Sequence, residues 1–120
     1  MSTKKTEEKK VRYGEGTRSA MEEAYHLIAP EGLRALGRRC AAGEIGHGEG
    51  NWKHYDKQGV KQIFNHIVGH LYDELSVAPE NTTEENAGAI MWGGMALAYY
   101  AAQKPEIYRQ AVDELFNGVE

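Results

Sequence analysis

The sequence is short of cysteine and of long apolar runs. Cys40 is the single cysteine in 120 residues, so no disulfide can form within the chain, and one thiol agrees with a reducing compartment. The first ten residues, MSTKKTEEKK, carry charges and no apolar stretch, unlike a secretory signal. The longest nearly apolar run, Ala87 to Ala102, is shorter than the ~20 residues that span a bilayer. We therefore expect a cytoplasmic protein without a membrane partner.

The chain also has no excess of basic charge. Lysine and arginine number 14 against 18 aspartate and glutamate residues, and the formal net charge is -4. Proteins that bind DNA or RNA usually carry a basic patch that neutralises phosphates. The balance argues against a nucleic acid polymer as partner. A free nucleotide accompanied by a metal ion remains compatible with it.

No alternating, β-branched run of strand length is evident, whereas apolar residues recur at helical spacing in several segments. We predict an all-α fold, a compact bundle of four to five helices, with Cys40 in the core. Residues 1–16 are expected to be a flexible tail, and residues 17–120 a single all-α domain. The predicted helices cover residues 19–28, 30 to about 43, 57–76, 83–103, and a last segment from Pro105.

Capping signals support two of these helix starts. Ser19 with Glu22, and Thr82 with Glu85, have the spacing of a capping box, in which a hydroxyl and a carboxylate satisfy backbone donors. Glu85 has a second interpretation as a metal ligand in the first turn of a helix. The segment 83–103 is apolar on nearly all sides and rich in small residues, so it needs neighbours all round, in a bundle or at a subunit interface.

A stripe of histidine and acidic residues lies on the helix predicted for residues 57–76. His66, His70 and Asp73 fall within about 60° of one another on a helical wheel, with Glu74 beside His70. Imidazole and carboxylate groups so placed can face one metal ion. The apolar face of the same helix points well away from His66 and Asp73, however. An ordinary solvated face is therefore the alternative.

The segment GEIGHGEGNW, residues 43–52, resembles neither of the common phosphate-binding loops. It follows a predicted helix instead of a strand, and it lacks the Lys-Ser/Thr of a Walker A loop. Asn51 and Trp52 are candidates to hold a base, and Arg34 and Lys53 to contact phosphates. The alternatives are a tryptophan that covers the core and basic side chains that face solvent.

Two patterns in the run HLIAPEGLRALGRRCAAGEIGHGEGNW carry a resemblance to a known family. Pro-x-x-Leu-Arg-x-Leu begins at Pro30, and Gly-x-x-x-x-Gly-x-x-Asn-Trp begins at Gly43. Residues 65–68, 85–86 and 92–93 follow in a similar order. The chain resembles the dATP/dGTP diphosphohydrolase N-terminal domain found in many phage proteins, a relative of the MazG-type all-α nucleotide pyrophosphohydrolases.

The resemblance implies a MazG-like bundle that hydrolyses a nucleoside triphosphate, such as dATP or dGTP, to the monophosphate and pyrophosphate. It also implies Mg²⁺ or Mn²⁺ held by helix-borne carboxylates, a homodimer or higher homo-oligomer, and the host cytoplasm as location if the origin is a phage. The metal-ligand candidates on this basis are Glu44, His66, His70, Asp73, Glu74 and Glu85.

The sequence departs from the family pattern at three positions. Ala41 stands where members usually have a glutamate, while Asn86 and Gly93 replace a histidine and an asparagine. Glu44, about one helical turn after Ala41, is the candidate to replace the missing carboxylate and to serve in catalysis. Two alternatives stay open: a member that binds or sequesters a nucleotide or a nucleotide-like signal without cleaving it, and a helical interaction protein.

Overall fold

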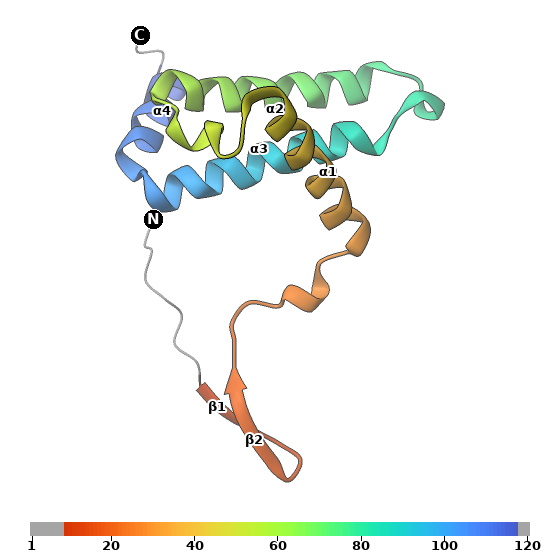
Figure 1. The fold of residues 1–120 in the computed structure, drawn as a ribbon, viewed down its shortest axis with the longest axis vertical. Coiled ribbons are helices and arrows are strands. Elements are labelled where there is room, and N and C mark those ends of the chain that lie inside the picture. The colour runs from red at the N-terminus through yellow and green to blue at the C-terminus, as the bar shows by residue number, and fades with distance from the viewer. Residues whose placement is uncertain (1–8, 118–120) are drawn as a thin grey trace.

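The computed structural model describes residues 9–117, and most of them are helical (Figure 1). The helices are α1, Pro30–His47; α2, Lys57–Ser76; α3, Glu84–Gln103; and α4, Pro105–Asn117. Short 3-10 turns precede three of them: η1, Tyr25–Leu27; η2, Asn51–His54; and η3, Pro79–Asn81. Strands β1, Lys9–Tyr13, and β2, Gly16–Ala20, pair antiparallel at the start of the described residues. The predicted all-α bundle of packed helices is confirmed.

Helix α3 is the centre of the bundle. It runs alongside α2 in the opposite direction, while α4 folds back against both and α1 packs across the first turns of α3 (Figure 1). The hairpin lies apart from the helices and is joined to α1 through η1. The end of the bundle where α4 and η2 meet α2 and α3 is therefore covered by more elements than the opposite end.

The hydrophobic core occupies that covered end. Its buried members are Val60 and Ile63 from α2, Ala96 and Tyr100 from α3, and Ala111 from α4. We call these five residues the core end. Half-buried aromatic side chains, among them Trp52, Phe64 and Trp92, pack around it.

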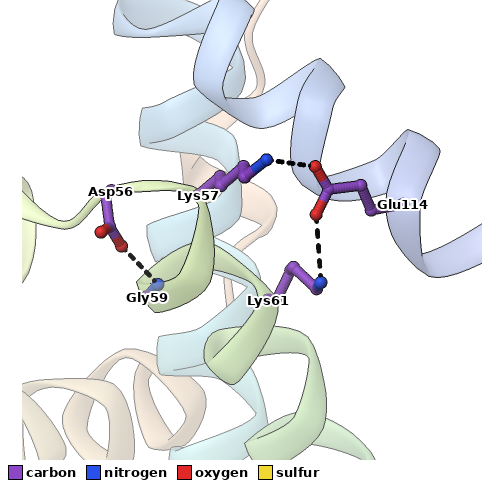
Figure 2. Close-up of polar contacts among 5 residues, drawn as sticks. All are labelled: Asp56, Lys57, Gly59, Lys61 and Glu114. Atoms are coloured by element: carbon purple, nitrogen blue, oxygen red, sulfur yellow. Dashed lines mark hydrogen bonds and ion pairs between the residues drawn. The ribbon is translucent and has the colours of Figure 1, made fainter. Parts of the chain in front are cut away.

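Polar contacts fix α2 at the same end (Figure 2). The Asp56 carboxylate accepts a hydrogen bond from the backbone N–H of Gly59 at 3.1 Å, which caps the start of α2. Glu114 on α4 accepts hydrogen bonds from Lys57 and from Lys61, the latter at 3.1 Å. Because the Glu114 side chain is only 9% exposed, these two bonds tie α4 to the first turns of α2.

The apolar face of α2 is packed over only part of its length. Val60, Phe64 and Ile67 face the bundle as predicted, but Leu71 and Leu75 are 45% and 82% exposed. Helix α4 does not extend far enough to cover this second half of the face (Figure 1).

The helix predicted for residues 19–28 is wrong. Ser19 lies in β2, opposite Lys10, with Gly14 at φ 62° in the two-residue turn. Ala29 is extended, as residues before a proline usually are, and only the short turn η1 forms between hairpin and α1. The expectation that no strand would form is therefore wrong as well. Of the predicted tail 1–16, residues 1–8 lie outside the described residues, and the remainder forms β1, the hairpin turn and the first residue of β2.

Two further expectations are corrected at α1 and α3. Thr82 does not cap α3, because its hydroxyl donates to the carbonyl of Pro79 and α3 begins one residue later. Cys40 is exposed instead of being in the core. Helix α1 buries only Ala35 and continues past Gly43 to His47, and no element within residues 9–117 covers Cys40 in its second half.

Helix α3 has neighbours on three sides. The exposed residues Ala87, Gly94 and Ala98 lie within about 40° of one another on its remaining side.

No helix in residues 9–117 is both long enough and apolar enough to cross a lipid bilayer.

Candidate functional site

A hydrogen-bonded chain of three side chains joins the second half of α2 to the first turn of α3. Nδ1 of His70 lies 3.0 Å from Oδ1 of Asn86, and Nδ2 of Asn86 donates to Oε1 of Glu74 at 3.1 Å. His70 and Glu74 are four residues apart, so they share one face of α2. All three side chains are partly buried. This is the largest polar contact between α2 and α3 in the described residues.

A second polar contact joins the same turn of α3 to α1. Arg38 donates to the carboxylate of Glu84, and both side chains are more than half exposed. Exposed ion pairs of this kind are worth about 0–1 kcal/mol. We call these five residues, Arg38, His70, Glu74, Glu84 and Asn86, the polar junction.

Two glycines of α3 set the spacing of its neighbours at the junction. A Cβ at Gly88 would lie 2.8 Å from the carbonyl oxygen of Ala35 on α1, and one at Gly93 would lie 2.4 Å from Ile67 on α2. Glycine therefore allows the backbones to approach closely enough for the polar contacts to form. Gly88 and Gly93 lie on roughly opposite sides of α3, so α1 and α2 flank it.

The predicted metal ligands are distributed over this region unevenly. His70 and Glu74 are brought together through Asn86. The other candidates are exposed: His66 and Asp73 on α2, Glu85 next to Asn86 on α3, and Glu44 near the end of α1. Within residues 9–117, no group of three or more histidine, cysteine, aspartate or glutamate side chains is placed to hold one metal ion.

Three of the predicted nucleotide-binding residues, Asn51, Trp52 and Lys53, lie on η2, and Arg34 lies on α1. Arg34 and Asn51 are exposed. Trp52 is half buried and makes edge contacts with Trp92 and Tyr99, at centroid distances of 5.6 and 5.0 Å. The Trp52 ring thus covers the core end, as the alternative interpretation proposed.

Lys53 lies beside this aromatic cluster. Its ammonium is 5.7 Å from the centroid of Trp52 and 5.4 Å from that of Tyr99, within the range of a cation–π contact. Lys104 donates to the carbonyl of Lys53, which holds the backbone of η2 to the end of α3.

The hydroxyl of Tyr100 on α3 holds the backbone of η2 in place through two hydrogen bonds. It accepts a hydrogen bond from the backbone N–H of Tyr55 at 2.8 Å and donates to the carbonyl of Trp52 at 2.5 Å. Burial raises the pKa of Tyr100, so the hydroxyl keeps the proton that it donates. The turn that carries Asn51 and Lys53 is therefore anchored to the end of α3 through Trp52, Lys53 and Tyr55.

The fold and the sequence together identify the class of protein. With helices packed around α3 and polar contacts from its first turn to α1 and to α2, the chain is an all-α protein. Over residues 12–110 it matches the family described as dATP/dGTP diphosphohydrolase, N-terminal. The chain belongs to this family, a family of nucleotide hydrolases by its description. Comparison with curated proteins and with solved structures gives no match.

Arg38, Glu84 and Asn86 belong to the junction but are not among the predicted site residues, and Asn86 is the one that contacts two other side chains. It was noted only as a departure from a family histidine, although it touches both polar side chains of α2. The His70/Glu74 pair at i and i+4 was the available signal. Where such a pair faces another helix and is partly buried, its polar groups need a hydrogen-bonding partner on that helix.

Proposed function

We propose that the protein hydrolyses a deoxynucleoside triphosphate, such as dATP or dGTP, to the monophosphate and pyrophosphate with Mg²⁺ or Mn²⁺. The observation that carries this proposal is the family match, which spans η2, α1, α2 and α3 and so includes the whole polar junction. The acidic and imidazole side chains gathered there supply the hydrogen-bonding and proton-accepting groups that phosphate hydrolysis needs.

The described residues do not form a complete protein cage for a metal ion. Mg²⁺ is commonly held by one or two carboxylates together with substrate phosphates and water, so such a cage is not required. We propose that Glu44, Glu74 and Glu85 are the carboxylates available for this role, with His66, His70 and Asp73 on the adjoining face of α2. The ion would neutralise phosphate charge and lower the pKa of a bound water.

The nucleotide would bind beside η2. Asn51 and Lys53 are exposed on a turn that is anchored to α3, so they can contact a base and a phosphate without ordering a loop. Trp52 supports this turn from the core side, and Arg34 on α1 is exposed for a phosphate contact.

A second copy of the chain would cover the remaining side of α3. The exposed small residues Ala87, Gly94 and Ala98 permit close approach of another helix, and α3 is otherwise apolar there. We propose a homodimer through this face. Light scattering would then give twice 13.4 kDa, and Gly94→Glu, which places a charge in the contact, would give the monomer mass. A monomer mass for the unaltered chain would refute the dimer.

Release of pyrophosphate from a panel of deoxynucleoside and ribonucleoside triphosphates tests the activity. We expect release that requires Mg²⁺ or Mn²⁺ and is abolished by a chelator. Glu44→Gln, which keeps size and removes charge, should lower kcat at least tenfold, about 1.4 kcal/mol in barrier. The matched control is Glu49→Gln, also exposed and only five positions further on, which should keep full activity.

Failure to release pyrophosphate from any nucleotide would refute the hydrolase proposal. The alternative, a member that binds without cleaving, is favoured by one structural observation: Asn86, a departure from the family pattern, is fully engaged between His70 and Glu74. That alternative predicts that a nucleotide raises the unfolding temperature and yields no product.

A further inference from the structure

The hydrogen bonds of Asn86 determine which way its amide points. Glu74 as a carboxylate can only accept hydrogen bonds, so the group of Asn86 that faces it at 3.1 Å must be the NH2. The amide oxygen then necessarily faces the other way, toward His70. Amide orientation is in this case settled by the chemistry of a neighbour.

The orientation of Asn86 in turn determines the proton position on His70. Oδ1 of Asn86 is an acceptor and lies 3.0 Å from Nδ1 of His70. Two acceptors cannot form a hydrogen bond, so Nδ1 must carry the proton and donate it. A neutral imidazole has one N–H only, and Nε2 is then left with its lone pair.

We propose that Asn86 is a positioning residue that holds neutral His70 in the Nδ1–H tautomer and so keeps Nε2 as a fixed acceptor nitrogen. Glu74 acts through Asn86, because its charge fixes the amide. The inference deepens the proposed function, on which its use rests: an acceptor nitrogen in a known place can bind an N–H, an O–H or a cation of the ligand. The tautomer itself does not depend on that function.

The other histidine of the stripe provides an internal comparison. His66 lies one turn earlier on α2 and is exposed, and its side chain makes no hydrogen bond to any residue from 9 to 117. No side chain within residues 9–117 fixes the tautomer of His66. A difference between the two rings that disappears in Asn86→Ala is therefore attributable to the Asn86 contact.

Long-range ¹H–¹⁵N correlation spectra of the metal-free, nucleotide-free chain test the proposal. At about pH 8.5, where an ordinary imidazole is neutral, we expect a protonated-type shift for Nδ1 of His70 and an unprotonated-type shift for Nε2. Asn86→Ala removes the acceptor and should exchange the two shifts or average them. His66 should give the same spectrum in both proteins.

A second variant separates the role of Glu74 from simple packing. Glu74→Gln keeps the size of the side chain but can donate as well as accept, so the Asn86 amide is no longer fixed. We expect a mixture of His70 tautomers in this variant, although Asn86 is unchanged. A purely structural Asn86–Glu74 contact would leave the His70 shifts as they are.

Several outcomes would overturn the proposal. A wild-type His70 with the proton on Nε2 would do so without any variant, even if Asn86→Ala failed to fold. An Asn86→Ala protein that is folded by circular dichroism and keeps the Nδ1–H pattern would do so as well. Because the spectra are recorded without substrate, absence of pyrophosphate release would refute the proposed function and leave the tautomer result standing.

Discussion

The two ends of the helical bundle differ in what fills them. At the core end, Val60 and Tyr100 are completely buried and Ile63 is 3% exposed. At the polar junction, α2 and α3 meet through His70, Asn86 and Glu74, while Leu75 nearby is 82% exposed. The buried core and the polar junction are thus separated along the same pair of helices. The polar groups lie where packing contributes least, so their replacement should affect function more than folding.

The strongest test of this separation removes apolar volume from the core end. Ile63→Ala leaves a cavity between α2 and its neighbours, and a buried Ile→Ala change costs about 2–5 kcal/mol. We expect a loss of unfolding free energy in this range, measured by urea denaturation monitored through tryptophan fluorescence. The junction should keep its His70 tautomer in the part of the population that stays folded.

The matched control lies three turns further along α2. Leu75→Ala removes a similar side chain, but Leu75 is 82% exposed, so the change should stay within about 0.5 kcal/mol. Equal losses at the two positions would mean that the two ends are not packed differently, and the comparison would fail.

The spacing of α1 at the junction gives a second, smaller effect. In Gly88→Ala the new Cβ would lie 2.8 Å from the carbonyl oxygen of Ala35, so α1 must move away from α3. Overpacking of this kind costs about 1–3 kcal/mol. We expect a loss of that size in unfolding free energy, together with weaker nucleotide binding, because α1 carries Arg34.

Gly37→Ala is the control for that variant. Gly37 is an exposed residue inside α1, and apart from its chain neighbours and the nearby backbone of α1 no atom lies within 4 Å of the position a Cβ would take. Alanine in a helix interior is favoured over glycine by about 0.5–1 kcal/mol. Stability should therefore rise slightly in this variant, and a loss in both would contradict the assignment of the Gly88 effect to contact with α1.

The sequence predicted the long helices well. The residues 57–76 were expected to be helical from their apolar period and are α2, and the proline starts at Pro30 and Pro105 are confirmed. The spacing of apolar residues is a local property of the sequence, so it predicts a helix without knowledge of the helices that pack against it. The capping boxes failed because Ser19 pairs in a β-ladder and Thr82 bonds back to Pro79, two outcomes that depend on neighbouring structure.

The polar junction was less predictable than the helices that build it. The wheel of α2 placed His70 beside Glu74, but it could not show that α3 would present Asn86 between them. The faces of α2 and α3 that meet depend on the close contact between Gly93 and Ile67, two residues that lie far apart in sequence. Such pairings are set by tertiary packing, which a single sequence does not display.

The smallest expected effect concerns the ion pairs of the core end and depends on pH. Hydrogen bonds from Lys57 and Lys61 hold the pKa of Glu114 below its ordinary value of 4.5. A carboxylate with a lowered pKa in the folded state contributes stability that is complete above that ordinary value and is lost as the pH falls through the lowered one. The Glu114→Gln variant should therefore unfold at a lower urea concentration than the unaltered chain at about pH 7, with a difference that shrinks below about pH 4.5 and vanishes in stronger acid.

The control is Glu49→Gln, in an exposed turn with no ion pair in the described residues. Its urea midpoint should equal that of the unaltered chain at every pH. Urea midpoints across the pH series measure this, and a Glu114→Gln deficit that persists in acid would mean that the side chain acts by packing between α2 and α4 and not by its charge.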